Sequence, residues 1–433
     1  MSRVGQSVHR TFQSLSERNF RLYFTGQLIS ASGTWMNLTA SAWLVLHLSN
    51  SGIALGLNTT LLFVPVLLFG AFGGVLADRF DKRRILLWTQ AGFVVISLTM
   101  WTLVGTGVVQ LWMVYLLSFV FGMVTAVDNP TRQSFYADLV GVEHVTNAVS
   151  LNSAAFTGAR IVGPAVAAFL IATAGKNDVT GGIARCFLVD GVSYLAVITA
   201  LLRMRVADMH PQQRSTRVRG HLKAGLKYVW RTDELRRPLL IMTVVFAMSF
   251  NFAVLFPLLA KRTFGGSVVT FGVFSALAGL GSFLGAIVLA NRAAHPTMKR
   301  LGVFSVACGA TLVVVGLAPT LHLEYLAMVP LGFAVMAFMI TANTILQVNA
   351  RPQLRGRVMA LYGVVFLGST PIGAPIAGWI GQHWSARGGL IVGGAFALAM
   401  GLVTLWWRRR DPAPASEEPD AVEVETALLP STA

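Results

Sequence analysis

Long apolar runs separated by short polar breaks follow one another along almost the whole chain. Each run has about 20 residues or more, the length that an α-helix needs to cross the hydrocarbon of a bilayer. Most breaks are so short that consecutive helices must be antiparallel neighbours. The pattern predicts an all-α membrane protein with twelve transmembrane helices, at 20–47, 53–77, 84–105, 110–136, 145–173, 183–204, 238–262, 267–291, 299–319, 323–347, 357–382 and 388–407.

The composition agrees with a chain that crosses a membrane many times. Of its 433 residues 55% are hydrophobic and 12% are charged, about half the charged fraction of a soluble domain. The net charge of +16 does not indicate nucleic-acid binding, because the bases lie in the gaps between apolar runs. Cys186 and Cys308 show neither metal-ligand spacing nor a disulfide framework. The first apolar run has full span length and no small-residue cleavage site, so we expect a retained helix.

Basic residues are distributed unequally between the two sides of the predicted bundle. If the N-terminus is inside, 28 of the 34 lysines and arginines lie on that side, and the other side holds Lys176, Arg185, Lys261, Arg262 and Arg387. Positive charge is retained on the cytoplasmic side of a membrane. We therefore expect a multi-pass protein of the cytoplasmic (inner) cell membrane, with both termini in the cytoplasm.

The loops divide the chain into four parts. Residues 1–204 form a first set of six spans, 205–236 a basic cytoplasmic linker, and 237–410 a second set of six. Residues 411–433 carry acids and no bases, so we expect a disordered acidic tail. Residues 220–230 of the linker predict either a helix on the anionic inner leaflet or, more simply, a solvated loop.

The turn between the second and third spans, GVLADRFDKRR at 74–84, holds two acids and four bases, and must lie in water. It resembles motif A of the major facilitator superfamily. Asp81 stands where Gly is commoner, a variant similar to the enterobactin-exporter and macrolide-efflux (transmembrane secretion effector) branch. The resemblance implies the major facilitator fold, with two six-helix halves. It also implies a conformational latch, in which an acid meets the start of helix eleven and a base meets an acid on helix four. The residues at these places are Gly74, Asp78, Arg79, Lys82, Arg83 and Asp128.

Asp128 lies within the fourth predicted span, where a charge is costly and needs a partner or a role. Two interpretations compete for it. In the first, Asp128 pairs with Lys82 or Arg83 of the turn and latches the cytoplasmic side. In the second, it carries a proton. Its depth near the turn and the available bases favour the latch.

Two further ionisable residues lie within predicted spans. Arg160 is either a structural partner of Asp128 or of helix carbonyls, or it attracts an anionic substrate group or controls the protonation of a carboxylate. Asp190 is expected near the outer end of the sixth span, either solvated at the interface or paired with Arg185, with proton coupling as the alternative. Asp128, Arg160 and Asp190 are thus the candidates for proton coupling.

Small residues and proline recur in the fifth and eleventh spans. Residues 158–168 resemble motif C of drug exporters, in which small residues allow close helix packing and proline bends the helix. Gly163, Pro164, Gly373 and Pro375 are the predicted bend residues. Drug–proton antiporters of the superfamily often carry an arginine in the fourth span, at the place that Ser118 occupies here. The sequence therefore does not identify which residue would couple transport to a proton.

A substrate cavity is expected between the halves near the membrane midplane. Polar, aromatic and methionine side chains at that depth are either cavity residues or lipid-facing and packing residues; they are Trp35, Asn37, Asn58, Phe250, Asn251, Met336, Phe338 and Asn343. Aromatic and methionine side chains suit bulky apolar ligands.

No nucleotide-binding loop or catalytic motif stands out in the sequence, so we expect secondary transport, with no enzyme activity, cofactor, metal, nucleotide or nucleic acid. The resemblance implies a monomeric exporter of bulky apolar drugs or siderophore-like metabolites, working by proton antiport across the lipid bilayer. Uptake or lysolipid flipping by the same fold is the alternative. A non-transporting membrane sensor or assembly factor is the alternative of another class.

Overall fold

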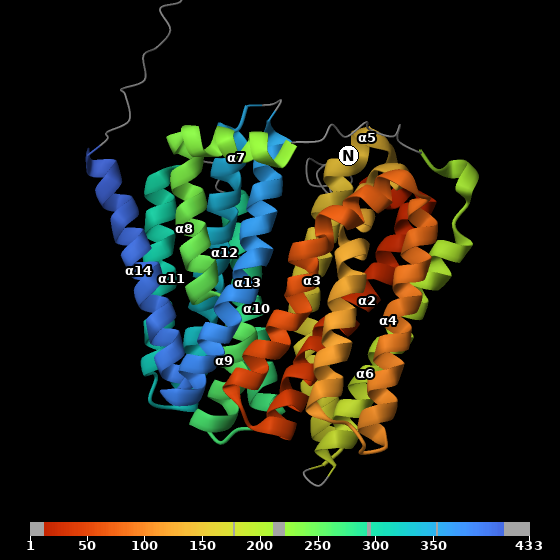
Figure 1. Ribbon diagram of the computed structural model, residues 1–433, viewed down its shortest axis with the longest axis horizontal. Helices are drawn as coiled ribbons and strands as arrows, with labels where there is room; N and C mark the ends of the chain where they lie inside the picture. Colours follow the sequence, from red (N-terminus) through yellow and green to blue (C-terminus); the bar gives the residue numbers. More distant parts are fainter. Residues whose placement is uncertain (1–12, 176–177, 211–220, 292–295, 352–353, 411–433) are drawn as a thin grey trace, which may run out of the picture.

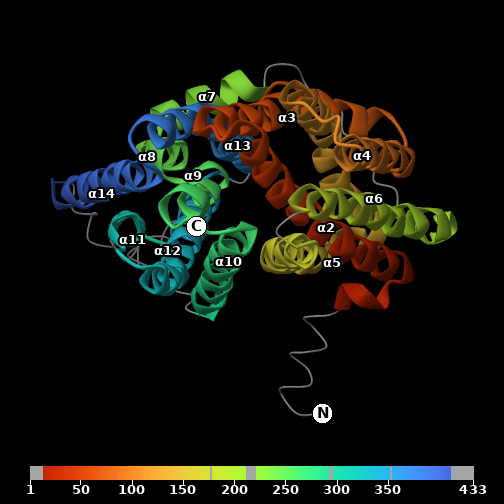
Figure 2. The same cartoon turned by 90° about the horizontal axis from the view of Figure 1, so that it is seen from below.

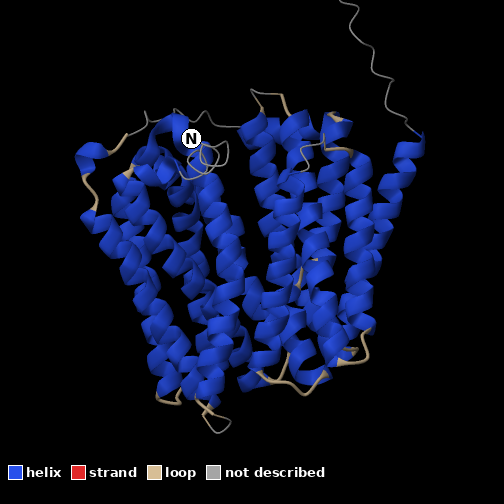
Figure 3. Ribbon diagram, turned by 180° about the vertical axis from the view of Figure 1, so that it is seen from behind, coloured by secondary structure: helices blue, strands red, loops and turns tan. Residues whose placement is uncertain are grey.

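The computed structural model describes residues 13–175, 178–210, 221–291, 296–351 and 354–410, and within these ranges it contains helices and no strand (Figure 1 and Figure 3). The first half consists of α2 (Arg18–Ser49), α3 (Gly52–Arg79), α4 (Lys82–Gly105), α5 (Leu111–Thr173) and α6 (Val179–Arg203), with the short helices η1 (Gln13–Ser16) and η2 (Val206–Asp208). The second half consists of α8 (Asp233–Ser249), α9 (Phe252–Leu258), η3 (Leu259–Thr263), α10 (Val268–Asn291), α11 (Met298–Leu317), α12 (Leu321–Asn349), α13 (Arg355–His383) and α14 (Ala386–Arg410). The predicted acidic tail lies outside the described residues.

The long helix α5 contains two spans. Gly141, with a φ of 72°, interrupts it and turns the chain back, a conformation that glycine adopts without steric cost. The seventh span is the opposite case, because one crossing is divided into α8, α9 and the π-helical turn η3. Phe250 and Asn251 lie at the break between α8 and α9.

Eleven helical segments within the described residues are long and apolar enough to cross a membrane. The predicted first span, α2, is 32 residues long but more polar than these, since it buries Gln27, Ser30, Asn37, Thr39 and Ser41. It packs against α5 and α6 inside the bundle. Its polarity has a structural reason: four of its polar or aromatic residues line a central cavity described below.

The two halves touch at one end and diverge toward the other. A Cβ at Gly378 of α13 would lie 2.4 Å from the carbonyl oxygen of Gly52, and one at Gly56 would lie 2.5 Å from that of Ala374. Further along the same helices, a Cβ at Gly70 or at Gly363 would meet nothing within 4 Å. The helices separate toward the end where α7 lies (Figure 3). We name this end the α7 end and the opposite one the far end.

The helix α7 (His221–Arg231) runs across the ends of α8 and α13, roughly perpendicular to the spans (Figure 1). Val229 is buried, whereas Leu226 and Trp230 are exposed. The hydroxyl of Tyr228 accepts a hydrogen bond from the backbone N–H of Arg351 at 3.3 Å. The linker therefore contains a helix where one of the two sequence interpretations placed it, and its contact with a leaflet stays a prediction.

Candidate functional site

A cavity of about 300 Å³ lies between the two halves. Its wall is formed by residues of α2, α3, α4, α5 and α6 on one side and of α8, α9, α10, α12 and α13 on the other. Figure 2 shows the two helix groups side by side around this central region. The volume lies at the lower end of the range of small-molecule sites, about 300–1,000 Å³.

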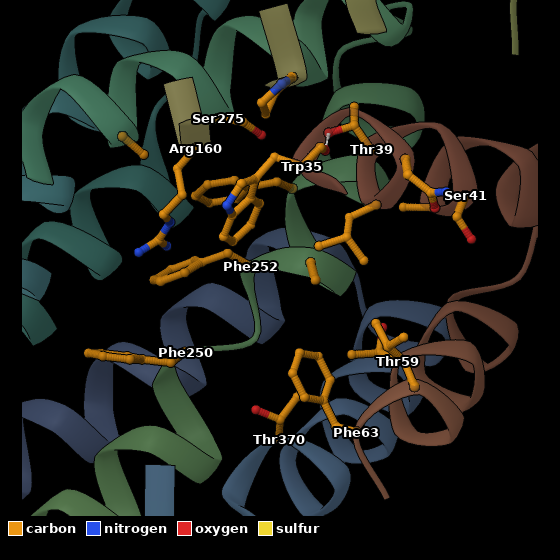
Figure 4. A pocket seen from close by; sticks show the side chains of 18 of the residues that line it. Trp35, Thr39, Ser41, Thr59, Phe63, Arg160, Phe250, Phe252, Ser275 and Thr370 are labelled. Atoms are coloured by element: carbon orange, nitrogen blue, oxygen red, sulfur yellow. Dashed lines mark hydrogen bonds between the residues drawn. The ribbon is translucent and has the colours of Figure 1, made fainter. Parts of the chain in front are cut away.

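Aromatic side chains dominate the cavity wall (Figure 4). They come from both halves and are Trp35, Phe63, Phe121, Phe187, Phe246, Phe250, Phe252, Phe256, Phe271 and Phe366. Hydroxyl and amide groups are interspersed, among them Thr39, Ser41 and Ser275. A wall of this kind binds a bulky apolar molecule by contact area, with a few polar groups to orient it.

The break in the seventh span faces this cavity. Phe250 and Asn251 have non-helical backbone angles, and Phe250 and Phe252 line the wall. Irregular backbone at membrane depth is tolerated where it is covered by protein or lines a cavity, and interrupted helices mark substrate sites in many transporters. Phe250 also packs against Phe246 with ring centroids 4.9 Å apart, which stabilises the break.

Arg160 is the only charged residue among the described residues that line the cavity. Its guanidinium lies over the indole of Trp35, 5.0 Å from the ring centroid (Figure 4), a favourable cation–π geometry. The predicted structural pairing of Arg160 with Asp128 is wrong, because Asp128 pairs with Arg132. Arg160 presents a positive charge to the cavity instead.

Four of the eight predicted cavity residues line the cavity, namely Trp35, Asn37, Asn58 and Phe250. The other four lie elsewhere. Asn251 donates to the carbonyl of Ala247 and packs against Gly373, while Met336 packs against α10. Phe338 forms a second layer behind Phe246 and Phe250, and Asn343 accepts a hydrogen bond from Gln347.

Ser118, at the place where the resemblance to drug–proton antiporters implies an arginine, lies on the cavity wall. Its hydroxyl donates to the side-chain oxygen of Asn58 at 2.8 Å. The site therefore contains a neutral pair at this place.

Of the predicted bend residues, Pro164 lines the cavity, and Gly163 lets α5 approach α2, since a Cβ there would lie 2.5 Å from the Cβ of Trp35.

Asp190 is fully buried near the middle of α6, and not near an outer helix end as predicted. The predicted solvation at the interface is therefore wrong. The helix begins at Val179, one turn earlier than the apolar run indicates. The carboxylate accepts hydrogen bonds from Asn37 of α2 at 2.6 Å and from Ser97 of α4 at 2.7 Å, both on the same oxygen. Its other oxygen has no hydrogen-bond partner among the described residues.

Asp128 has a different environment. Arg132, one turn further along α5, forms an ion pair with it at 2.7 Å. Thr89 and Gln90 of α4 donate to its other oxygen at 2.8 and 2.9 Å. Arg132 in turn donates to Gln27 of α2 at 3.0 Å. The buried charge is thus balanced and hydrogen-bonded, the condition under which an ionised pair is tolerated inside a protein.

The predicted pairing of Asp128 with Lys82 or Arg83 is not found. Lys82 contacts Asp138 of α5 at 2.8 Å instead, and Arg83 donates to the carbonyl of Leu201 at the end of α6 at 2.7 Å. The sequence prediction missed Asp138 because it placed the end of the fourth span at residue 136, whereas the helix continues to Gly141. In this structure, these two bases join α4 to α5 and α6 within the first half.

The remaining latch residues lie at the α7 end of α3. Asp78 and Gly74 are half-buried and Arg79 is exposed. Close contact with α5 is made by Gly73, where a Cβ would lie 2.1 Å from the carbonyl oxygen of Ala126. Asp81, the departure from motif A, caps α4 by accepting the N–H of Arg84 at 2.9 Å, a common role of aspartate.

A set of hydrogen bonds closes the far end. Lys261 of η3 donates to the carbonyl of Leu46 at 2.8 Å. Arg262 donates to the carbonyl of Asn50 and to the side-chain oxygen of Gln382. The same Gln382 oxygen accepts the N–H of Gly52 at 2.8 Å. We name these bonds the far-end clasp. Apart from the Arg262–Gln382 bond within the second half, they join the end of α2, the α2–α3 loop and the start of α3 to the second half.

Glu324 was not predicted as an ionisable residue inside the bundle, because it stands at the start of an apolar run. It is fully buried in the first turn of α12. Neither carboxyl oxygen has a hydrogen-bond partner among the described residues. Arg387 of α14 lies nearby, donates to the carbonyl of Ala318 at 2.6 Å and stacks on Phe264. This group lies beside the far-end clasp and not in the cavity wall.

The arrangement of helices matches solved transporter structures. The nucleoside transporter NupG covers 90% of this chain and 98% of its own length, with a TM-score of 0.69 and 12% identity. The D-xylose–proton symporter covers 90% of this chain and 96% of its own length, with a TM-score of 0.70 and 15% identity. At these identities the likeness concerns the fold. It confirms the predicted all-α membrane protein with the major facilitator fold.

Sequence relatives are named as transporters. The "Staphyloferrin A transporter" of Staphylococcus aureus is 25% identical over 272 residues, 62% of this chain. That alignment spans 66% of the relative, just under two thirds of its length. The "Macrolide efflux protein A" of Streptococcus pyogenes is 22% identical over 86% of this chain and 93% of its own. The "Multidrug efflux pump Tap" of Mycolicibacterium fortuitum is 23% identical over 81% of this chain and 86% of its own length.

The family model described as "Transmembrane secretion effector" matches residues 9–427. This match spans nearly the whole chain, both helix groups and the cavity between them. It agrees with the branch of the superfamily that the motif A variant indicates. The chain belongs to the transmembrane secretion effector family.

Proposed function

We propose that this protein exports bulky, largely apolar small molecules across the cytoplasmic membrane by alternating access. The observation that carries the proposal is the aromatic cavity between the halves, with a single positive charge in its wall and the far-end clasp closed beside it. The relatives named for staphyloferrin, macrolide and multidrug transport support the same substrate range. A molecule with an apolar body, either a drug or a siderophore-like metabolite, is the proposed substrate.

The α7 end is the proposed cytoplasmic side. Basic residues support this orientation, since Lys82, Arg83, Lys227 and Arg355 lie on helices that begin or end there. The divergence of the halves toward this end supports the proposal that this state takes up substrate from the cytoplasm. The motif A residues are the proposed latch of the opposite state, in which the α7 ends come together.

We propose that a proton entering from the outside drives each export cycle. Asp128, Arg160 and Asp190 are the candidates for coupling, and their surroundings differ. Asp128 is balanced by Arg132, and Arg160 carries its positive charge into the cavity. Asp190 has no cation within 4 Å in the described part of the chain and is the strongest candidate for the proton site.

Transport into inside-out vesicles tests the export function. Ethidium, a macrolide and a hydroxycarboxylate siderophore would be offered separately, with and without an imposed proton gradient. We expect gradient-dependent accumulation of at least one of them and a loss of about tenfold in Trp35→Ala, because the cavity loses a large aromatic wall. Trp88→Ala, a change at a tryptophan of α4 that is 79% exposed, is the matched control.

The outcome also discriminates the alternatives. Substrate movement out of inside-out vesicles would support uptake. Transfer of a lysolipid between leaflets without movement of the three probes would support lysolipid flipping. No transport of any probe by a folded, inserted protein would refute the export function and favour a sensor or assembly role.

A further inference from the structure

Asp190 sits at a three-helix junction inside the first half. Asn37 comes from α2, Ser97 from α4 and the aspartate from α6. Asn37 and Ser97 donate to one carboxyl oxygen, and the other oxygen is buried without a hydrogen-bond partner in the described part of the chain. Two donors and no cation leave an ionised carboxylate only partly compensated in the low dielectric of a helix bundle. The site can therefore change its charge by binding one proton.

The groups around the carboxylate do not supply a counter-charge. On α6 itself, the thiol of Cys186 lies one turn before Asp190 and the phenol of Tyr194 one turn after it. The Tyr194 hydroxyl shares a hydrogen bond of 3.1 Å with Thr34 of α2. Beyond Tyr194 lies the Asp128–Arg132 pair of α5, whose charges already balance each other. Asp190 is thus a fully buried acid with no counter-charge among the described residues.

Asn37 connects this acid to the substrate cavity. Its amide N–H₂ donates to Asp190, and the same side chain forms part of the cavity wall beside Trp35. A hydrogen bond to an ionised carboxylate is roughly twice as strong as one to a neutral group. The protonation state of Asp190 therefore changes how firmly the Asn37 amide is held and what it offers to a molecule in the cavity.

We propose that Asp190 is the proton-binding residue of the transport cycle and that Asn37 transmits its protonation to the cavity. The proposal rests on the function proposed above and identifies the site of its coupling. The step is the addition of one proton to the carboxylate, with no other bond made or broken. When Asp190 is ionised, it holds the Asn37 amide by a charge-assisted hydrogen bond and adds a negative charge behind the cavity wall. When Asp190 is protonated, this negative charge is lost, the hydrogen bond weakens and a cationic substrate is released.

The substrate class that exchanges best with a proton at this site is an amphiphile with one positive charge. Such a molecule is attracted by the ionised carboxylate and repelled after protonation, so that proton and substrate exclude each other. An anionic substrate would respond in the opposite sense, because protonation of Asp190 removes the negative charge that repels it. Whether protonation of Asp190 weakens or strengthens substrate binding thus indicates whether the natural substrate is a cation or an anion.

Proton binding can be measured without any transport. Infrared difference spectra of the purified full chain, recorded between about pH 5 and pH 9, show the carbonyl stretch of a protonated carboxylic acid. Glu324→Gln serves as the background for these spectra, since it removes the other buried carboxyl without a hydrogen-bond partner among the described residues. In this background we expect a buried acid band that titrates with and without Asp128→Asn and is lost in Asp190→Asn. Asn37→Ala should keep the band but shift its frequency, since one of two donors is gone. Ser118→Ala, whose partner is Asn58, should not shift it.

Transport then tests the coupling. We expect Asp190→Asn to lose the pH dependence of ethidium exchange that the wild type shows, and to lose about tenfold or more of the gradient-driven accumulation of ethidium. Asp190→Glu should restore part of the accumulation. A buried acid band that persists when Asp190→Asn is combined with Glu324→Gln would overturn the proposal. Gradient-driven accumulation that persists in Asp190→Asn would overturn it as well. If the band behaves as expected but no variant transports any probe, the proton site stands and the export function fails.

Discussion

Arg262 offers a direct test of how the far end is held closed. It donates to the carbonyl of Asn50 in the other half and to the side-chain oxygen of Gln382, which itself accepts the N–H of Gly52. Arg262→Ala removes the first bond between the halves and frees the side chain that makes the second. We expect the equilibrium to shift toward a state that is open at the far end.

The magnitude follows from the number and exposure of these bonds. A hydrogen bond to a charged group contributes about 1.5–3 kcal/mol when it is buried, but Arg262 is exposed, which reduces the contribution to about 1 kcal/mol. The hydrogen bond from the N–H of Gly52 to Gln382, which loses its support from Arg262, adds about 0.5–1 kcal/mol to this contribution. The loss of about 1.5–2 kcal/mol corresponds to a shift of roughly 10- to 30-fold in the ratio of the two states. Lys261 still holds Leu46, so complete opening is not expected.

Distance measurements between two labels can detect this shift. Thr106→Cys and Ser267→Cys place exposed labels at the far end, one on each half, and the natural cysteines are buried. We expect a second, longer distance population in Arg262→Ala that is weak or missing in the parent. Arg185→Ala removes an exposed charge of α6 at the same end and is the control. An unchanged distance distribution in Arg262→Ala would refute the clasp as the element that holds this end.

Three further predictions concern the helix contact, the balanced pair and the cavity charge. Gly378→Val should prevent far-end closure and reduce transport by about tenfold or more, since even a Cβ would lie 2.4 Å from a carbonyl oxygen of α3; Gly363→Val, where a Cβ meets nothing within 4 Å, should transport normally. Asp128→Ala should lower the free energy of unfolding by about 3–5 kcal/mol, measured by denaturant titration, because Arg132 is left without its partner; a loss below about 1 kcal/mol would contradict the role of the pair. Arg160→Gln should weaken the binding of anionic ligands by roughly tenfold and leave cationic dyes as tightly bound or tighter, as equilibrium binding would show.

The fold could be predicted from the sequence because span length and loop charge are local properties. The twelve apolar runs correspond to helices, including the polar α2 and the interrupted seventh span. Helix ends were harder to predict. The fourth span continues to Gly141, and this extension brings Asp138 into reach of Lys82. A short amphipathic end of a helix does not extend an apolar run, so the hydrophobic pattern cannot indicate it.

The cavity was only half predictable, for a geometric reason. Depth in the membrane follows from position along a span, and all eight predicted residues were chosen by depth. The face that a side chain presents depends on how helices pack. Phe250 reaches the cavity because the backbone breaks beside it, whereas Phe338 packs behind it as a second layer. The depth of both residues in the membrane can be inferred from the sequence, but the direction in which each helix face points cannot.

The buried aspartates Asp128 and Asp190 show where sequence reasoning could have gone further. Asp128 has Arg132 four residues later, and residues at this spacing face each other on a helix. The sequence alone therefore allowed this acid to be assigned as balanced.

Around Asp190, the residues three and four positions away are Cys186, Phe187, Ser193 and Tyr194, and none carries a positive charge. Its own helix thus left this acid unbalanced, and only the packing of α2 and α4 could decide its state. These helices bring Asn37 and Ser97, which donate hydrogen bonds but no charge. The difference between a structural acid and a proton-binding acid therefore depends on two uncharged side chains from other helices.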